Sequence, residues 1–224
     1  MRVKIETVVV VAGGHPSRSP ITPPGLPADA YVIAADAGVD RALALGLRIE
    51  QAIGDFDSVT PAGLAAAEAA GAVIEHHPAA KDATDLELAL DAASGLDPAR
   101  IVVIGSAGGR LDHLLGSMLL LGDARYAGAT VDAYLGPNRL TVIRGSRVLT
   151  GVPGEIVSLV PVHGPATLAR VAPASGTGRN TSAPQMTANP TTTLLSMAPS
   201  LSPNGPYAPK ATQARGSLPH SARA

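Results

Sequence analysis

Cysteine and tryptophan are absent from this chain of 224 residues, and its aromatic side chains are one phenylalanine and four tyrosines. Without cysteine the chain can form neither a disulfide nor a thiolate metal site, which fits a reducing compartment. With so few aromatics, the core has to be built from Ala, Val, Leu and Ile. The hydrophobic content of 46% makes a sizeable core of this kind possible.

Long hydrophobic runs are also missing. No stretch reaches the ~18 apolar residues of a membrane span. The apolar run at 8–12 leads into two glycines rather than into the cleavage site of a secretory signal. We therefore expect a soluble, cytoplasmic protein that binds neither membranes nor nucleic acid.

Acidic residues are absent from the last 59 positions. All 18 Asp and Glu residues lie between Glu6 and Glu155, and with 12 basic residues they give segment 1–165 a net charge of −6. Segment 166–224 holds five basic residues, 15 Ser or Thr, 12 Ala and eight Pro. Such a segment cannot bury enough apolar surface to offset its ordering entropy, so we expect a disordered tail.

Strand-like and helix-like segments alternate up to about residue 121. The predicted strands are 8–12, 31–35, 51–53, 72–75 and 101–104, and the predicted helices are 36–46, 60–71, 85–94 and 111–121. This alternation is typical of a Rossmann-like α/β fold, a mostly parallel sheet with flanking helices.

After residue 130 the pattern changes to short strands at 131–135, 140–143, 147–149 and 155–160, which we interpret as antiparallel. We therefore divide the chain into an α/β domain at 1–128, the start of a β-sandwich domain at 129–165, and the tail at 166–224.

Acidic side chains follow several predicted strands. They are Asp36 after the second strand, Asp55 and Asp57 after the third, Asp82 and Asp85 before the third helix, and Asp112 after a glycine-rich loop. Because the carboxyl ends of parallel strands share one edge of a sheet, we expect these acids to converge there. Carboxylate oxygens without cysteine suit Mg²⁺, which usually joins one or two carboxylates to substrate phosphates. Phe56 lies between two of these acids and is expected to point into the core and fix the turn.

The glycine-rich loop 105–109 precedes a helix and Arg110. It matches neither P-loop nor GxGxxG spacing, but consecutive backbone N–H groups before a helix can bind an anion, and the planar guanidinium suits phosphate.

Each of these features also has a plainer interpretation. The two acids at 55 and 57 can form a solvated turn, Asp82 and Thr84 can be helix caps, Lys81 can be a solvated lysine, and His113 can be structural. The conjunction of metal-binding and phosphate-binding groups at one edge favours the functional interpretation.

Four motifs together resemble the thiamine pyrophosphokinase family. They are ADAG at 35–38, GDFDS at 54–58, KDATD at 81–85 and GSAGGRLDH at 105–113. The resemblance covers about residues 6–165. It implies an α/β nucleotide-binding, catalytic domain at 1–128 and a thiamine-binding β-sandwich begun at 129–165. It also implies a homodimer with thiamine at the subunit interface.

The activity implied by the resemblance is Mg²⁺-dependent transfer of pyrophosphate from ATP to thiamine, giving thiamine diphosphate and AMP. The catalytic residues are then Asp55, Asp57, Asp82, Asp85 and Arg110, of which the four carboxylates are the Mg²⁺ ligands. The ATP-binding residues are Asp36, Lys81, Thr84, Ser106, Gly108, Gly109, Arg110, Asp112 and His113. The thiamine-binding residues and the carboxylate that acts as base do not follow from the sequence.

The resemblance ends near residue 165, where the family's further strands would continue. The acid-free sequence that follows is interpretable as a shifted reading frame of GC-rich DNA or as a natural disordered tail. Two alternative functions therefore remain. One is a pyrophosphokinase of another alcohol, such as a hydroxymethylpterin. The other is a C-terminally frameshifted, inactive member that still binds MgATP.

Overall fold

The structure, a computed structural model, describes residues 4–14, 23–149, 157–162, 168–172, 185–188 and 193–199. The elements up to residue 121 are β1 (Thr7–Ala12), β2 (Tyr31–Ala35), α1 (Gly38–Ala44), β3 (Gln51–Gly54), α2 (Pro61–Ala69), β4 (Val73–His76), α3 (Asp85–Gly95), β5 (Arg100–Gly105) and α4 (Leu111–Leu121). Those that follow are the 3₁₀ turn η1 (Ala124–Tyr126), β6 (Thr130–Leu135), β7 (Asn138–Arg144), β8 (Ser146–Val148), β9 (Ser158–Val162), β10 (Leu168–Ala172), β11 (Gln185–Ala188) and β12 (Thr193–Pro199). The alternation predicted for residues 8–121 is confirmed, with small shifts at the ends of the elements.

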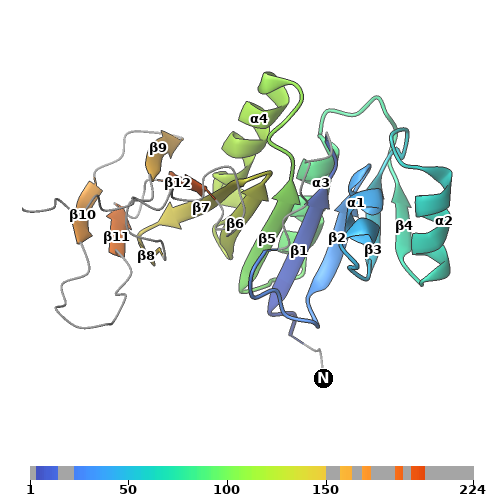
Figure 1. Cartoon of the computed structure of the whole chain (residues 1–224), viewed down its shortest axis with the longest axis horizontal. Coiled ribbons are helices and arrows are strands. Elements are labelled where there is room, and N and C mark those ends of the chain that lie inside the picture. Colours follow the sequence, from blue (N-terminus) through green and yellow to red (C-terminus); the bar gives the residue numbers. More distant parts are fainter. Residues whose placement is uncertain are drawn as a thin grey trace, which may run out of the picture.

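Nine strands form one mixed sheet in the order β4-β3-β2-β1-β5-β6-β7-β12-β9. The strands from β4 to β6 in this order are parallel neighbours, and the pairs beyond β6 are antiparallel. Figure 1 shows the parallel part flanked by α1 to α4 and the antiparallel part extending from its β6 side. The predicted fold class, a mostly parallel sheet with flanking helices, is confirmed.

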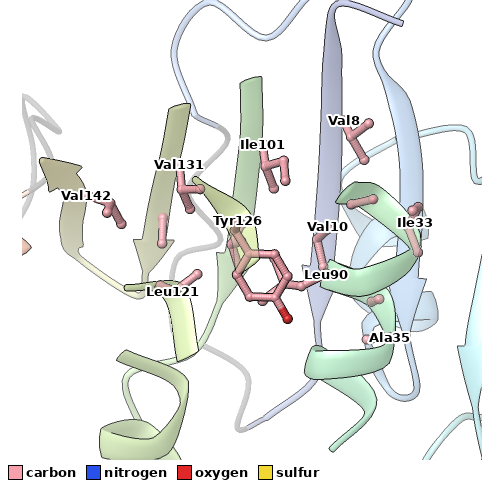
Figure 2. Close-up of a cluster of buried hydrophobic side chains, with 14 of the residues drawn as sticks. Val8, Val10, Ile33, Ala35, Leu90, Ile101, Leu121, Tyr126, Val131 and Val142 are labelled. Carbon is pink, nitrogen blue, oxygen red and sulfur yellow. The ribbon is translucent and has the colours of Figure 1, made fainter. Parts of the chain in front are cut away.

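The central strand β1 is buried on both of its faces. Residues 8–11 are four consecutive valines without solvent exposure, and each fully buried valine side chain stabilises the fold by about 1.5–3 kcal/mol. Val8 and Val10 belong to a cluster with Leu90 of α3 and Tyr126 of η1 (Figure 2). Val9 and Val11 belong to a second cluster on the α1 and α2 side. The near-absence of aromatics is therefore compensated by β-branched side chains in a three-layer core.

Two threonines determine where α2 and α3 begin. Thr60 Oγ1 accepts a hydrogen bond from the N–H of Gly63 at 3.0 Å, and Thr84 Oγ1 accepts one from the N–H of Glu87 at 3.2 Å. Each bond satisfies an N–H group that has no partner within the helix, which typically stabilises a helix by ~1 kcal/mol. Both helices begin within one residue of the starts predicted at 60 and 85.

The strand expected at 131–135 is β6, and its pairing differs from the prediction. It is parallel to β5 and antiparallel to β7, so antiparallel pairing begins one strand later than we expected. The reason is that α4 and η1 form the long crossover connection that two parallel strands need. One sheet thus continues across the domain boundary proposed at 128/129, which stays a prediction.

Three strands lie within the segment 166–224, which we expected to be disordered. β12 inserts between β7 and β9, antiparallel to both, and β10, β11 and β8 form a second sheet. For these three segments the expectation is wrong, because a composition averaged over 59 residues hides the uncharged run TLLSMAP at 193–199. The remaining residues of the tail lie outside the described residues.

In the part of the chain that the structure describes, the longest helices have 11 residues, and none is long and apolar enough to cross a membrane.

Candidate active site

The loops after β1, β2 and β5 meet at the carboxyl edge of the parallel strands. A Cβ atom added to Gly13 would lie 3.0 Å from Cβ of Ala37, and one added to Gly14 would lie 3.0 Å from Cβ of Ser106. Arg41 Nη2 donates a hydrogen bond to the carbonyl oxygen of Gly14 at 3.1 Å. The two glycines after β1 therefore lie against both the ADAG turn and the glycine-rich loop that follows β5.

The ADAG motif forms the turn between β2 and α1. Asp36 has φ of 45° and donates its N–H to the carbonyl oxygen of Ile53 at 2.9 Å, which ties the turn to β3. A Cβ atom at Gly38 would lie 1.9 Å from the carbonyl oxygen of Val11, so this position has no room for any side chain. The glycine of the motif lets α1 begin directly against β1, and this contact positions Asp36.

Three carboxylates come together at this edge. Asp36, Asp55 and Asp57 each offer one oxygen, and these oxygens all lie within 4.8 Å of one another. Burial raises the pKa of Asp36, and the carboxylates of Asp85 and Asp55 raise it further, although a hydrogen bond from the N–H of Ala37 acts in the opposite direction. Oδ1 of Asp36 is buried and has no hydrogen-bond partner among the described residues. A buried carboxylate oxygen of this kind is chemically suited to bind a cation.

The GDFDS turn holds its two carboxylates through local hydrogen bonds. The N–H of Asp57 donates to Oδ1 of Asp55 at 3.3 Å, and Ser58 Oγ donates to Oδ1 of Asp57 at 2.7 Å. The bond from Asp57 is the main cause of a lowered pKa at Asp55, and Lys81 contributes to it. Phe56 is partly buried against the cluster on the α1 and α2 side, as we predicted for the single phenylalanine.

Lys81 joins two of the acidic motifs. Its Nζ lies 3.5 Å from Oδ2 of Asp55 and 3.0 Å from Oδ1 of Asp85, and it donates to the carbonyl oxygen of Pro78 at 3.2 Å. The side chain of Lys81 is 14% exposed, so its interpretation as a solvated lysine is wrong. Burial lowers its pKa, but the contacts with Asp85 and Asp55 outweigh burial, and the pKa is raised.

The donor set of the three carboxylates fits Mg²⁺. This ion binds oxygen at 2.0–2.1 Å, so ligands on opposite sides of it lie roughly 4.2 Å apart, and the three oxygens here lie within 4.8 Å of one another. The group contains Asp55 and Asp57, two of the predicted ligands. It also contains Asp36, which we expected to bind ATP. Asp85 lies outside it in an ion pair, and Asp82 is an exposed residue outside it. The ligand assignment stays a prediction.

The glycine-rich loop presents backbone N–H groups at the start of α4. Ser106 Oγ accepts a hydrogen bond from the N–H of Gly108 at 3.0 Å, and Gly109 has φ of 98°. The helix begins after Arg110 without a side-chain cap, so its first N–H groups are not satisfied by a capping side chain. These features suit an anion site at the start of α4, and that site stays a prediction.

Arg110 projects from this loop and is paired with Asp112. Its Nε lies 3.1 Å from Oδ1 of Asp112, and both side chains are more than half exposed. This pairing lowers the pKa of Asp112 to about 2. His113 is exposed, and its carbonyl oxygen accepts a bond from Ser117. The structure thus pairs two of the predicted ATP-binding residues and leaves the guanidinium accessible to a ligand.

Sequence reasoning missed two features of this site. The first is that Asp36 joins Asp55 and Asp57, which requires knowing that β2 and β3 are neighbours. The second is the ring contact between Phe56 and His76, which is itself an exposed residue. No sequence motif indicates which strand ends are in contact, so neither feature could be predicted from the sequence.

A cavity of about 470 Å³ lies at the other edge of the sheet. It is next to the amino ends of β5 and β6 and includes Lys4, Asp97, Arg144 and Arg147 in its lining. None of the predicted site residues lines this cavity. The candidate active site is therefore the group of residues at the carboxyl edge and not the cavity.

Comparison with known proteins identifies relatives of the α/β part. Residues 26–131 match the family model for the thiamin pyrophosphokinase catalytic domain. A thiamine pyrophosphokinase of Bacillus subtilis is 37% identical over 117 residues, which are 52% of this chain and 55% of the relative. The match therefore spans about half the length of that curated relative.

Solved structures share the fold. The crystal structure of thiamine pyrophosphokinase from Bacillus subtilis has a TM-score of 0.67 at 22% identity and covers 88% of this chain and 100% of the other. The thiamin pyrophosphokinase from Geobacillus thermodenitrificans has a TM-score of 0.62 at 26% identity and covers 87% and 98%. The resemblance inferred from the four motifs is thereby confirmed: residues 26–131 are similar to the catalytic domain of thiamin pyrophosphokinases.

Proposed function

We propose that this protein transfers pyrophosphate from ATP to thiamine in a Mg²⁺-dependent reaction. The observation that carries the proposal is the group of three carboxylates at the carboxyl edge of the sheet, with Lys81 on one side and the glycine-rich loop of α4 along the same edge. The match of residues 26–131 to the thiamin pyrophosphokinase catalytic domain supports the choice of substrates. The alternative alcohol, a hydroxymethylpterin, has no observation in its favour.

Asp36, Asp55 and Asp57 are the residues that would hold Mg²⁺, with Asp82 and Asp85 as the further predicted contributors. Mg²⁺ bound there supplies charge neutralisation for the phosphate oxygens. Lys81 places a positive charge beside Asp55 and Asp85, where it limits the repulsion between the carboxylates and can also meet a phosphate. Catalysis of this kind is mainly positioning and charge stabilisation.

The remaining predicted residues act on the nucleotide. The backbone N–H groups of Gly108 and Gly109 and the hydroxyl of Ser106 cradle phosphate at the start of α4. The planar guanidinium of Arg110 binds the transferred group, and Asp112 orients this guanidinium. Thr84 and His113 stay predictions as ATP-binding residues, and Thr84 already has a capping role.

The transfer forms one bond and breaks one. The hydroxyl oxygen of thiamine attacks the β-phosphorus of ATP, and the bond from that phosphorus to the oxygen shared with the α-phosphorus breaks. AMP departs with the bonding electron pair, thiamine keeps the β- and γ-phosphates, and the hydroxyl proton passes to a rim carboxylate or to water. The homodimer, a thiamine site completed by the partner subunit, and the cytoplasmic location belong to this proposal and stay predictions.

Incubation of the full chain with ATP, MgCl₂ and thiamine tests the proposal. We expect thiamine diphosphate and AMP in equal amounts, with no product when hydroxymethylpterin replaces thiamine. The double variant Asp55→Asn, Asp57→Asn should lose more than ~100-fold in turnover. MgATP binding without turnover would instead support the inactive, frameshifted alternative. Absence of both binding and turnover would overturn both interpretations.

A further inference from the structure

The GDFDS turn has an unusual backbone at its aromatic residue. Phe56 has φ of 58°, in the left-handed region that bulky side chains rarely adopt. Its neighbours on both sides are carboxylates of the proposed metal group. A residue in such a conformation persists where surrounding structure holds it in place, and such residues cluster at ligand-binding sites. The contacts of Phe56 therefore determine how firmly the carboxylates of Asp55 and Asp57 are held in position.

The imidazole of His76 is the contact that reaches Phe56 from the neighbouring strand. The two ring centroids lie 4.8 Å apart, and the ring planes meet at 81°, which is the favourable edge-to-face arrangement. His76 is the last residue of β4 and lies opposite Gly54 in the β3–β4 register. The next N–H, that of His77, donates to the carbonyl oxygen of Gly54 at 2.8 Å. The end of β4 is thus fixed against the first residue of the turn.

The hydrogen bonds of the turn itself do not attach it to the sheet. The bond from the N–H of Asp57 to Asp55 and the bond from Ser58 to Asp57 both lie within the turn. Besides the backbone bond from His77 to Gly54, attachment to β4 and its following loop comes from two side-chain contacts. One is the ion pair with Lys81, and the other is the ring contact between Phe56 and His76.

We propose that His76 is a positioning residue for the metal group: its ring holds Phe56 in the left-handed conformation and so orients Asp55 and Asp57 toward Asp36. This inference rests on the proposed function, because the Mg²⁺ ion belongs to that proposal. His76 does not touch the reacting groups in this account. It acts through Phe56 alone, so an aromatic ring at position 76 is sufficient, and the ring nitrogens are not needed.

The chain offers a single-residue probe for this contact. Phe56 is the only phenylalanine in 224 residues, so protein labelled with [¹⁵N]phenylalanine gives one amide resonance, at the centre of the turn. Titration with MgCl₂ alone, without nucleotide or thiamine, reports Mg²⁺ affinity through the shift of this resonance. Because His76 is an exposed residue on the edge strand β4, replacing it leaves the buried core intact.

Three variants separate positioning from general packing. His76→Ala should displace the resonance in the metal-free protein and weaken Mg²⁺ binding about 10-fold or more, as is typical for residues that orient metal ligands. His76→Phe adds a second phenylalanine resonance, which is assigned by comparison, and should restore affinity to within about twofold of the parent chain. His77→Ala is the matched control. The ring of His77 contacts Glu75 at 2.8 Å rather than the turn, so affinity should not change.

Equal Mg²⁺ affinity and an unmoved resonance in His76→Ala would overturn the proposal, as would failure of His76→Phe to restore affinity. The melting temperature of each variant, measured in the same buffer, shows that the comparison is between folded proteins. Failure of the proposed function looks different. In that case the parent chain binds Mg²⁺ with the predicted dependence on position 76 but forms no thiamine diphosphate.

Discussion

Nζ of Lys81 lies 3.5 Å from Oδ2 of Asp55, and this ion pair connects the end of β3 to the loop that precedes α3. The same Nζ lies 3.0 Å from Oδ1 of Asp85, the first residue of α3 and four positions further along the chain. One lysine therefore joins two motifs that are separated by a strand and a helix. The acids around Asp36 repel one another, and Lys81 is the cation that offsets part of this repulsion.

Replacing this lysine should change the acid sensitivity of the fold. The folded-state pKa of Asp55 is lowered, first by the N–H of Asp57 and then by Lys81, so its ionised form stabilises the fold above the unfolded pKa near 3.9. That contribution is lost as pH falls through the folded pKa. In Lys81→Met the folded pKa should rise toward its ordinary value, and stability should fall less steeply below pH 4. Urea unfolding at a series of pH values measures this, and an unchanged profile would show that Lys81 does not act on Asp55.

Asp36→Asn should stabilise the protein at neutral pH while it weakens Mg²⁺ binding. Burial raises the folded-state pKa of Asp36 above the unfolded value, so stability is lost as pH rises from the unfolded pKa through the raised folded pKa. The neutral amide avoids the cost. The variant should therefore melt at a higher temperature than the parent at pH 7 and at the same temperature near pH 3, where the carboxyl is protonated in both states. Mg²⁺ affinity should drop at least ~10-fold. A lower melting temperature at pH 7 would contradict the assigned cause.

Arg110→Gln should affect catalysis without affecting stability. The guanidinium and its partner Asp112 are both exposed, and exposed ion pairs contribute little to folding. Loss of a group that stabilises developing charge typically costs 10²–10³ in turnover. The pKa of Asp112, about 2 in the parent, should rise toward its ordinary value in a carbon-13 NMR titration. A melting temperature that falls by several degrees would show that the pair is structural.

Gly38→Ala tests whether the ADAG turn depends on close approach of α1 to β1. The added Cβ would lie 1.9 Å from a backbone oxygen of Val11, which no side-chain rotation can relieve. We expect destabilisation by at least about 3 kcal/mol in urea unfolding. Gly116→Ala is the control, because nothing lies within 4 Å of the added atom in the middle of α4. It should stabilise the protein by up to about 1 kcal/mol. Similar unfolding midpoints for the two variants would refute the role of Gly38.

Much of the α/β part could be predicted, because the local sequence signals for strands and helix starts there match the elements that form. The run of valines at 8–11 defines a strand buried on both faces, and Thr60 and Thr84 define where helices begin. The acids also follow the predicted strands. Their placement at the carboxyl edge follows from the rule that parallel strands place their carboxyl ends together, and three of them, Asp36, Asp55 and Asp57, lie together there.

The features that sequence reasoning missed depend on which strands are neighbours. The meeting of Asp36 with the GDFDS acids follows from the β2–β3 pairing, and the His76 contact follows from β4 lying beside β3. β12 joins β7 and β9 although about 30 to 50 residues separate it from them in sequence. Pairings over such distances leave no periodic signal in the strand itself, so composition alone gave the wrong expectation there.

The central claim is tested most directly by following the β-phosphorus of ATP. ATP labelled with ³²P at the β-position is incubated with the full chain, MgCl₂ and thiamine, and the products are separated by chromatography. Our account predicts that the label appears in thiamine diphosphate and that the AMP formed is unlabelled. Label retained in ADP, or in unreacted ATP under conditions where MgATP is bound, would contradict pyrophosphate transfer by this chain.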